Sequence, residues 1–138
     1  ECEKHLQSLH YAKNELKELF PLTQKSYENL TQENIQAIDQ FIYRFSKLQD
    51  TVGEKLIKIV FALYEENIDK FTFIDILNRL EKANILSTKN WKELRNIRNE
   101  LSHNYDDNPL ESSVILNKVF EKEDSLEEIY KNLKNVLI

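Results

Sequence analysis

The chain has 138 residues, among them one glycine and two prolines, and its formal net charge is −5. Sandwiches and barrels of β-strands need a turn about every 8–12 residues, and phosphate-binding loops need glycine-rich turns, so this composition excludes both classes. The length fits one domain, and 41% hydrophobic with 31% charged residues is typical of globular proteins. We expect a single all-α domain over residues 1–138. The acidic balance disfavours indiscriminate binding to polyanions or to anionic membranes.

The cysteine content and the hydropathy pattern indicate the setting. Cys2 is the only cysteine, so no disulfide can form within the chain, and a reducing cytoplasm is its natural setting. No apolar run approaches the roughly 20 residues needed to span a bilayer, so we expect no membrane partner. Zinc-ligand spacings, serine nucleophile elbows and phosphate loops are absent, and His5 and His10 do not share a helix face. We therefore expect no metal and no cofactor.

Helical periodicity covers the first half of the chain. A first helix is predicted over residues 2–20 and ends at Pro21, and residues 21–31 form a polar connection. Thr31 is the expected N-cap of a long second helix. Gly53 lies in its middle at a cost of about 1 kcal/mol relative to alanine, which predicts a bend or a close helix contact. The apolar stripe of this helix comprises Ile35, Ile38, Phe41, Ile42, Phe45, Leu48, Val52, Leu56, Ile59, Val60 and Leu63.

Three further helices are predicted in the second half. Residues 71–77 alternate enough to resemble a strand, but Ile74, Leu77, Leu80 and Ala83 continue the helical period, so we predict a helix here. Ser87 or Thr88 caps the next helix, and Pro109 fits the first turn of a last helix to about residue 137. The acidic runs at 65–66 and 121–124 are expected to be solvated faces. The predicted architecture is an antiparallel up-and-down helical bundle with four long helices and a shorter one.

The fourth predicted helix differs from the rest of the chain in charge. Residues 88–105 hold four basic and two acidic side chains, a local balance of +2 within an acidic protein. Arg98 follows the apolar line of Trp91, Leu94 and Leu101, where a bundle needs hydrocarbon. An unpaired buried charge is expensive, so Arg98 is expected to meet an anion, a partner or a water-filled cleft.

Polar residues that can do chemistry follow Arg98 closely. Asn99 and His103 share a helix face, whereas His103 lies about 140° around the axis from Arg98. Arg98 and His103 converge only if the helix distorts near its end or if two copies of it face each other across a dimer. The second arrangement predicts a symmetric cleft.

The run from Arg98 to Tyr105 reads Arg-x4-His-x-Tyr, with Asn99 directly after the arginine. Arg-x4-His alone is a weak pattern, but the added Tyr and Asn make it fairly specific. It resembles the signature of the HEPN superfamily, and the longer form resembles HepT toxins encoded beside MNT nucleotidyltransferase antitoxins. The phrases at 45–50 and 91–95 extend the similarity over most of the chain.

This resemblance implies a HEPN-like bundle that acts as a homodimeric, metal-independent endoribonuclease. RNA supplies its own 2′-hydroxyl nucleophile, so the enzyme moves protons and stabilises the phosphorane. His103 is the expected general acid and base, Arg98 the phosphate and transition-state binder, and Asn99 an orienting residue. Flanking RNA phosphates would be bound by Lys89, Lys92 and Arg95.

The resemblance also implies a regulator. In the family, the partner nucleotidyltransferase transfers AMP onto the tyrosine of the motif, here Tyr105, and thereby silences the toxin. A bulky anionic group beside Arg98 and His103 would fill and neutralise the phosphate site.

Two other function classes stay open from the residues alone. The chain is also consistent with a non-catalytic HEPN module that presents a ligand or a partner nucleotidyltransferase. A purely structural dimerisation bundle is favoured if Arg98 is buried against a carboxylate with no cleft beside it. In that case Arg98 is a structural ion pair and His103 a helix C-terminal cap.

Overall fold

The computed structural model describes residues 1–104 and 108–138, and the side chains of residues 103 and 104 lie outside this description. In the described residues the protein is all-helical, as predicted. The elements are α1 (Cys2–Leu16), α2 (Gln24–Glu28), α3 (Gln32–Thr51), η1 (Val52–Leu56), α4 (Ile57–Ala62), η2 (Ile68–Lys70), α5 (Phe73–Lys82), α6 (Thr88–Asn104) and α7 (Pro109–Leu137). Among these helices none is long and apolar enough to cross a membrane.

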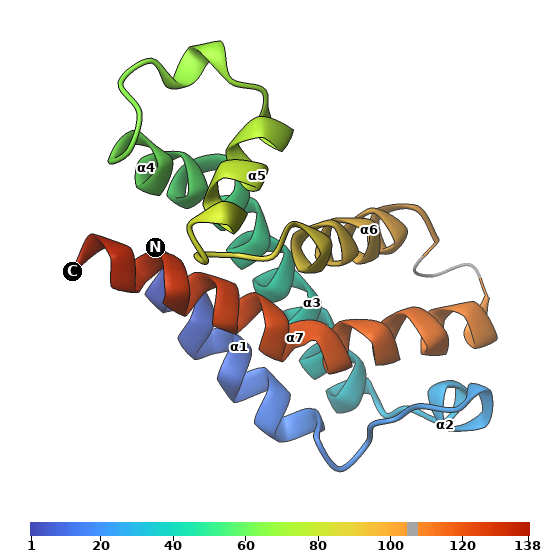
Figure 1. The fold of residues 1–138 in the computed structure, drawn as a ribbon. Coiled ribbons are helices and arrows are strands. Elements are labelled where there is room, and N and C mark those ends of the chain that lie inside the picture. The colour runs from blue at the N-terminus through green and yellow to red at the C-terminus, as the bar shows by residue number, and fades with distance from the viewer. Residues whose placement is uncertain (105–107) are drawn as a thin grey trace.

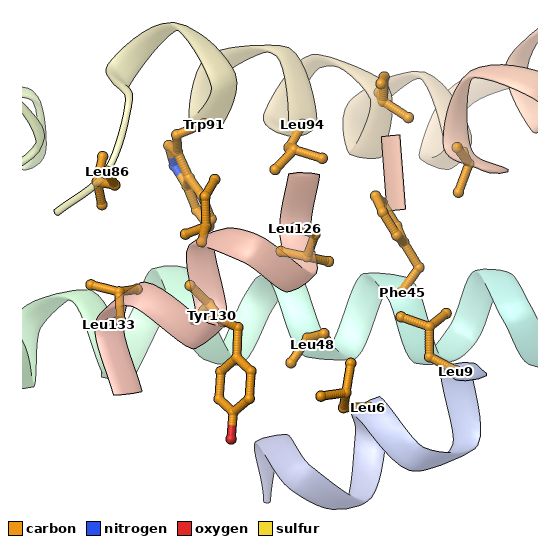
Figure 2. Close-up of a cluster of buried hydrophobic side chains, with 14 of the residues drawn as sticks. Leu6, Leu9, Phe45, Leu48, Leu86, Trp91, Leu94, Leu126, Tyr130 and Leu133 are labelled. Carbon is orange, nitrogen blue, oxygen red and sulfur yellow. The ribbon is translucent and has the colours of Figure 1, made fainter. Parts of the chain in front are cut away.

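The long helices pack around α3. Helix α1 lies along α3, while α7 contacts α6, α2, α3 and α4 (Figure 1). The two termini lie close together in the view, and Glu3 of α1 accepts hydrogen bonds from Tyr130 and Lys134 of α7. The core therefore forms between α1, α3, α6 and α7, which Figure 2 shows with Leu6, Phe45, Leu94 and Leu126 converging.

Side-chain caps begin several helices where the sequence predicted them. Thr31 accepts from the backbone N–H of Asn34, Ser87 accepts from that of Asn90, and Asn108 caps α7 with Pro109 in its first turn. Thr72, which was not among the predicted caps, starts α5 and forms a reciprocal capping box with Asp75. Each of these caps satisfies backbone donors that the first helical turn leaves unpaired.

The connection between the first two predicted helices differs from the prediction. Helix α1 ends at Leu16 rather than at residue 20, and the predicted polar connection contains the short helix α2. A capping box between Thr23 and Ser26 starts α2. Leu22, just before α2, is buried. The side chain of Asn117 in α7 accepts from the N–H of Leu22 at 2.6 Å and donates to its carbonyl at 2.8 Å, which fixes this connection against α7.

A π-helical segment corrects the predicted apolar stripe of the second helix. In η1 the N–H of Ile57 bonds to the carbonyl of Val52, five residues back. This wider turn adds one residue and rotates the following face by about 100°. Consequently Ile57 and Phe61 join the predicted Val60 in the core, whereas the predicted stripe members Ile59 and Leu63 are exposed.

Helix α5 confirms the helix predicted in this segment, with Ile76, Leu77 and Leu80 in the core and Ile74 exposed. One smaller expectation on burial was wrong. In the acidic run at 121–124, Glu123 is only 1% exposed, because this turn of α7 faces α1 and Lys13 lies 2.7 Å from its carboxylate. The run is therefore not a uniformly solvated face.

Candidate functional site

Arg98 lies at the centre of the candidate site. Its guanidinium donates to Ser102 Oγ, one turn further along α6, at 2.7 Å and to Asp50 Oδ2 of α3 at 3.3 Å. The side chain stays 31% exposed, and that of Asp50 is 37% exposed. The Nε atom of Arg98 is buried and has no hydrogen-bond partner among the described residues. The guanidinium is thus positioned from two sides and still reaches solvent.

A cavity of about 670 Å³ lies beside Arg98. The end of α3, the π-helical segment, the η2–α5 region and α6 surround it, and Arg95 and Asn99 join Arg98 on its α6 side. The expectation that Arg98 must meet an anion or a cleft is therefore confirmed on both counts. The arrangement that would favour a purely structural bundle, a buried pair with no cleft beside it, is not observed.

Gly53 explains how Trp91 of α6 comes so close to the π-helical segment at this cavity. A Cβ atom built on Gly53 would lie 2.9 Å from Cζ2 of Trp91. Only glycine leaves room for the indole ring at this point. The predicted close helix contact is confirmed, and it lies in the π-helical segment that lines the cavity.

The electrostatics of α6 favour an anionic ligand. Both acidic residues of the helix pair with lysines of α7, Glu93 with Lys122 at 3.3 Å and Glu100 with Lys118 at 3.6 Å. Lys89, Lys92 and Arg95, by contrast, are exposed and form no ion pair within residues 1–104 and 108–138. The three predicted RNA-binding cations thus have no acidic partner in the described part of the chain.

The remaining predicted site residues are only partly described. Asn99 is exposed and lines the cavity. The α-helix continues through Asn104, so the backbone position of His103 keeps an angle of about 140° from that of Arg98 around the axis. A distorted helix end therefore does not bring these positions together within one chain. Tyr105 lies outside the described residues.

Three contributors to the site were not among the predicted site residues. Asp50 belongs to the phrase at 45–50 that carried the resemblance, but nothing in the sequence showed that it faces Arg98. Ser102 is the i+4 neighbour of Arg98, so its spacing was a signal that could have identified it. Gln49 is 4% exposed and also lines the cavity, where its polar side chain interrupts the apolar face of α3.

Among the described residues, a separate cluster holds the side chains best placed to bind a metal. One ligand atom each from His10, Glu123 and Glu127 lies within 4.8 Å of the others. These groups already have protein partners, since His10 contacts Glu127 at 2.7 Å and Lys13 contacts Glu123 at 2.7 Å. Burial raises the pKa of Glu123 despite the lysine. Burial also acts to raise the pKa of Glu127, but hydrogen bonds from His10 and Lys131 lower it overall.

Comparisons with protein-family models, with curated proteins and with solved structures find no match to this chain.

Proposed function

We propose that this protein is a HepT-like toxin of the HEPN superfamily, a metal-independent endoribonuclease with a HEPN-like up-and-down bundle fold. The observation that carries the proposal is the position of Arg98. It lies half-exposed beside a cavity of about 670 Å³, braced by Ser102 and Asp50. A guanidinium held in this way can bind a phosphate through two parallel hydrogen bonds.

The proposed reaction uses the nucleophile of the substrate itself. The imidazole of His103 removes the proton of the ribose 2′-hydroxyl, whose oxygen attacks the adjacent phosphorus. The P–O5′ bond breaks and leaves a 2′,3′-cyclic phosphate, a His103 imidazolium gives its proton to the departing 5′-oxygen, and Arg98 stabilises the charge on the phosphorane. Asn99 orients the substrate or the imidazole. Lys89, Lys92 and Arg95 hold flanking phosphates.

A homodimer completes the proposed site, because one helix keeps the backbone positions of Arg98 and His103 apart. Leu110 and Val114, one turn apart on α7 shortly after the motif, are 53% and 46% exposed. An exposed apolar pair at this place supports a dimer contact. Val114→Asp should therefore shift the protein to the monomer in analytical ultracentrifugation. Ile59→Asp, at a 52% exposed position on α4, is the matched control and should leave the dimer intact.

The proposed regulator is an MNT-type nucleotidyltransferase that transfers AMP onto Tyr105. We place both proteins in the cytoplasm, consistent with the free thiol of Cys2. Co-expression with such an enzyme should add the mass of one AMP group to the wild type and nothing to Tyr105→Phe. Unmodified wild-type protein after co-expression with the nucleotidyltransferase encoded beside it would contradict this step.

Cleavage of a labelled RNA in the presence of EDTA tests the central proposal. His103→Ala should lower kcat by about 10²–10⁴-fold, the usual contribution of a general acid or base. Arg98→Lys keeps the charge but loses the planar fork, so it should also cleave more slowly. His5→Ala, on α1 and outside the site, is the matched control and should cleave like the wild type. Undiminished cleavage by His103→Ala would remove the assignment.

The ion pair of Arg98 favours one second candidate, a non-catalytic HEPN module. Because the guanidinium of Arg98 already donates a hydrogen bond to Asp50 at 3.3 Å, Arg98 can shape a binding surface without taking part in catalysis. The module predicts intact binding of a partner nucleotidyltransferase and no ribonuclease activity at any salt concentration. The same cleavage assay therefore separates the two candidates.

A further inference from the structure

The cavity beside Arg98 extends well beyond the guanidinium itself. Its volume of about 670 Å³ lies within the range of about 300–1,000 Å³ typical of small-molecule sites. A phosphate group bound at Arg98 would fill only a small part of it. The remaining space therefore suits the part of a ligand that continues from the phosphate.

Three aromatic side chains contribute to the cavity wall. Phe71, Phe73 and Trp91 all line it, and the rings of Phe73 and Trp91 are tilted by 55° with their centroids 6.4 Å apart. Gly53 lets Trp91 approach the π-helical turn, which fixes the position of the indole ring. Walls of this kind stack flat aromatic ligands, and nucleobases stack on such side chains irrespective of sequence.

A buried acceptor lines the same cavity and has no partner. Gln49 is 4% exposed, and its Oε1 atom has no hydrogen-bond partner in the described part of the chain. An unsatisfied buried acceptor is costly to the folded state, so it marks a place where a ligand N–H group gains a hydrogen bond. Every nucleobase carries such a donor on its pairing edge.

The charges around the cavity are mixed. Arg95, Arg98 and Lys58 are basic, whereas Asp50, Glu54 and Asp69 are acidic. A cavity lined by both basic and acidic side chains suits a ligand with one anionic end and several neutral hydrogen-bond donors. A nucleotide is such a ligand, because its phosphate is anionic and its ribose hydroxyls and base N–H groups are neutral donors. A purely polyanionic ligand would not need the three carboxylates.

We propose that this cavity is a nucleobase subsite. It holds the base of an RNA nucleotide next to the phosphate bound at Arg98, with the base against Phe71 and Phe73 beside the buried Trp91 and an N–H group donating to Gln49. The assignment of the ligand as RNA rests on the proposed function. The subsite makes cleavage depend on the base that enters it.

Nucleotide binding can be followed without any cleavage, because Trp91 is the only tryptophan of the chain and lines the cavity. The probes are AMP, CMP, GMP and UMP, with ribose 5-phosphate as the probe that lacks a base. The nucleotides should quench the Trp91 fluorescence saturably, and ribose 5-phosphate should not. Equal responses to ribose 5-phosphate and to all four nucleotides would show a phosphate site only and would overturn the subsite.

Gln49→Leu separates a ligand role from a structural one. Replacing an unpaired buried acceptor by an apolar group of similar shape should leave stability unchanged or raise it. The same variant should bind nucleotides about tenfold more weakly, since a hydrogen bond to the ligand is lost. Gln36→Leu, at an exposed position of α3, is the matched control and should bind like the wild type. Wild-type nucleotide affinity in a folded Gln49→Leu variant would overturn the proposal.

Comparison with RNA cleavage distinguishes the failure of the two proposals. Nucleotide binding that depends on Gln49, without cleavage of any RNA, would keep the subsite and remove the ribonuclease. Cleavage that depends on His103, with no quenching by nucleotides and the same base preference in Gln49→Leu, would keep the ribonuclease and remove the subsite.

Discussion

The contact between Gly53 and Trp91 gives the most direct test of the structure. Gly53 lies inside a continuous helical run, where alanine is favoured by about 1 kcal/mol. The added Cβ atom would lie 2.9 Å from Cζ2 and 3.3 Å from Cη2 of Trp91. The optimal separation of two carbon atoms is about 3.5–4.0 Å, so the indole ring must shift.

Two opposing terms set the expected effect of Gly53→Ala. Overpacking in a close-packed interior costs about 1–3 kcal/mol, and Trp91 is only 4% exposed. Subtracting the helix-propensity gain leaves a net destabilisation of about 0–2 kcal/mol. In a Trp91→Phe background the atoms Cζ2 and Cη2 are absent, so the same substitution should stabilise the protein by about 0.5–1 kcal/mol.

A double-mutant cycle measures the contact without assuming either term. The free energies of unfolding of the wild type, the two single variants and the double variant are obtained from urea titrations followed by far-ultraviolet circular dichroism. The coupling energy should be about 1–3 kcal/mol, which is within the range for contacting residues. An equal effect of Gly53→Ala in both backgrounds would refute the close approach of α6 to the π-helical segment.

Three other substitutions test separate parts of the molecule. Asn117→Ala leaves the N–H and carbonyl of Leu22 unpaired and should lower the free energy of unfolding by about 1–3 kcal/mol, whereas the exposed Asn132→Ala should change it little in the same urea titration. Burial raises the pKa of Glu123 above its ordinary value, so the folded state holds this proton more tightly, and the contribution of this carboxyl to the free energy of unfolding should fall as the pH rises through its raised pKa. Glu123→Gln should flatten this slope in urea titrations at several pH values, and an unchanged slope would contradict the buried carboxyl. For RNA binding, Lys92→Gln should reduce the slope of log affinity against log salt concentration by about 0.7. Lys25→Gln on α2 is the control and should leave this slope unchanged. An equal reduction in both variants would show that the basic face of α6 is not the binding surface.

Local signals were sufficient for most helix starts. A cap is a contact between residues two or three positions apart, so Thr31, Ser87 and Pro109 are recognisable without any knowledge of the fold. The misfit of Arg98 in an apolar stripe was visible in the same way. Its charge needed an anion or access to solvent, and Arg98 pairs with Asp50 and stays partly exposed beside the cavity.

Register and partners depended on contacts between distant residues. The π-helical turn rotates the face of α4, so burial of Ile57 and Phe61 and exposure of Ile59 could not be predicted from a constant period of 3.6 residues. Glu123 looked solvated because its neighbours are charged, and only the packing of α1 against α7 shows that it is buried beside Lys13.

The sequence by itself determined an all-α chain with a basic helix and one arginine that needed a counter-charge, because composition, caps and periodicity act over a few residues. Only the tertiary structure decided that this counter-charge is Asp50, 48 positions away, and that Gly53, Trp91 and Gln49 enclose a cavity beside it. Such juxtapositions arise when separate helices pack, and their geometry is set by the volumes and shapes of all the side chains between them.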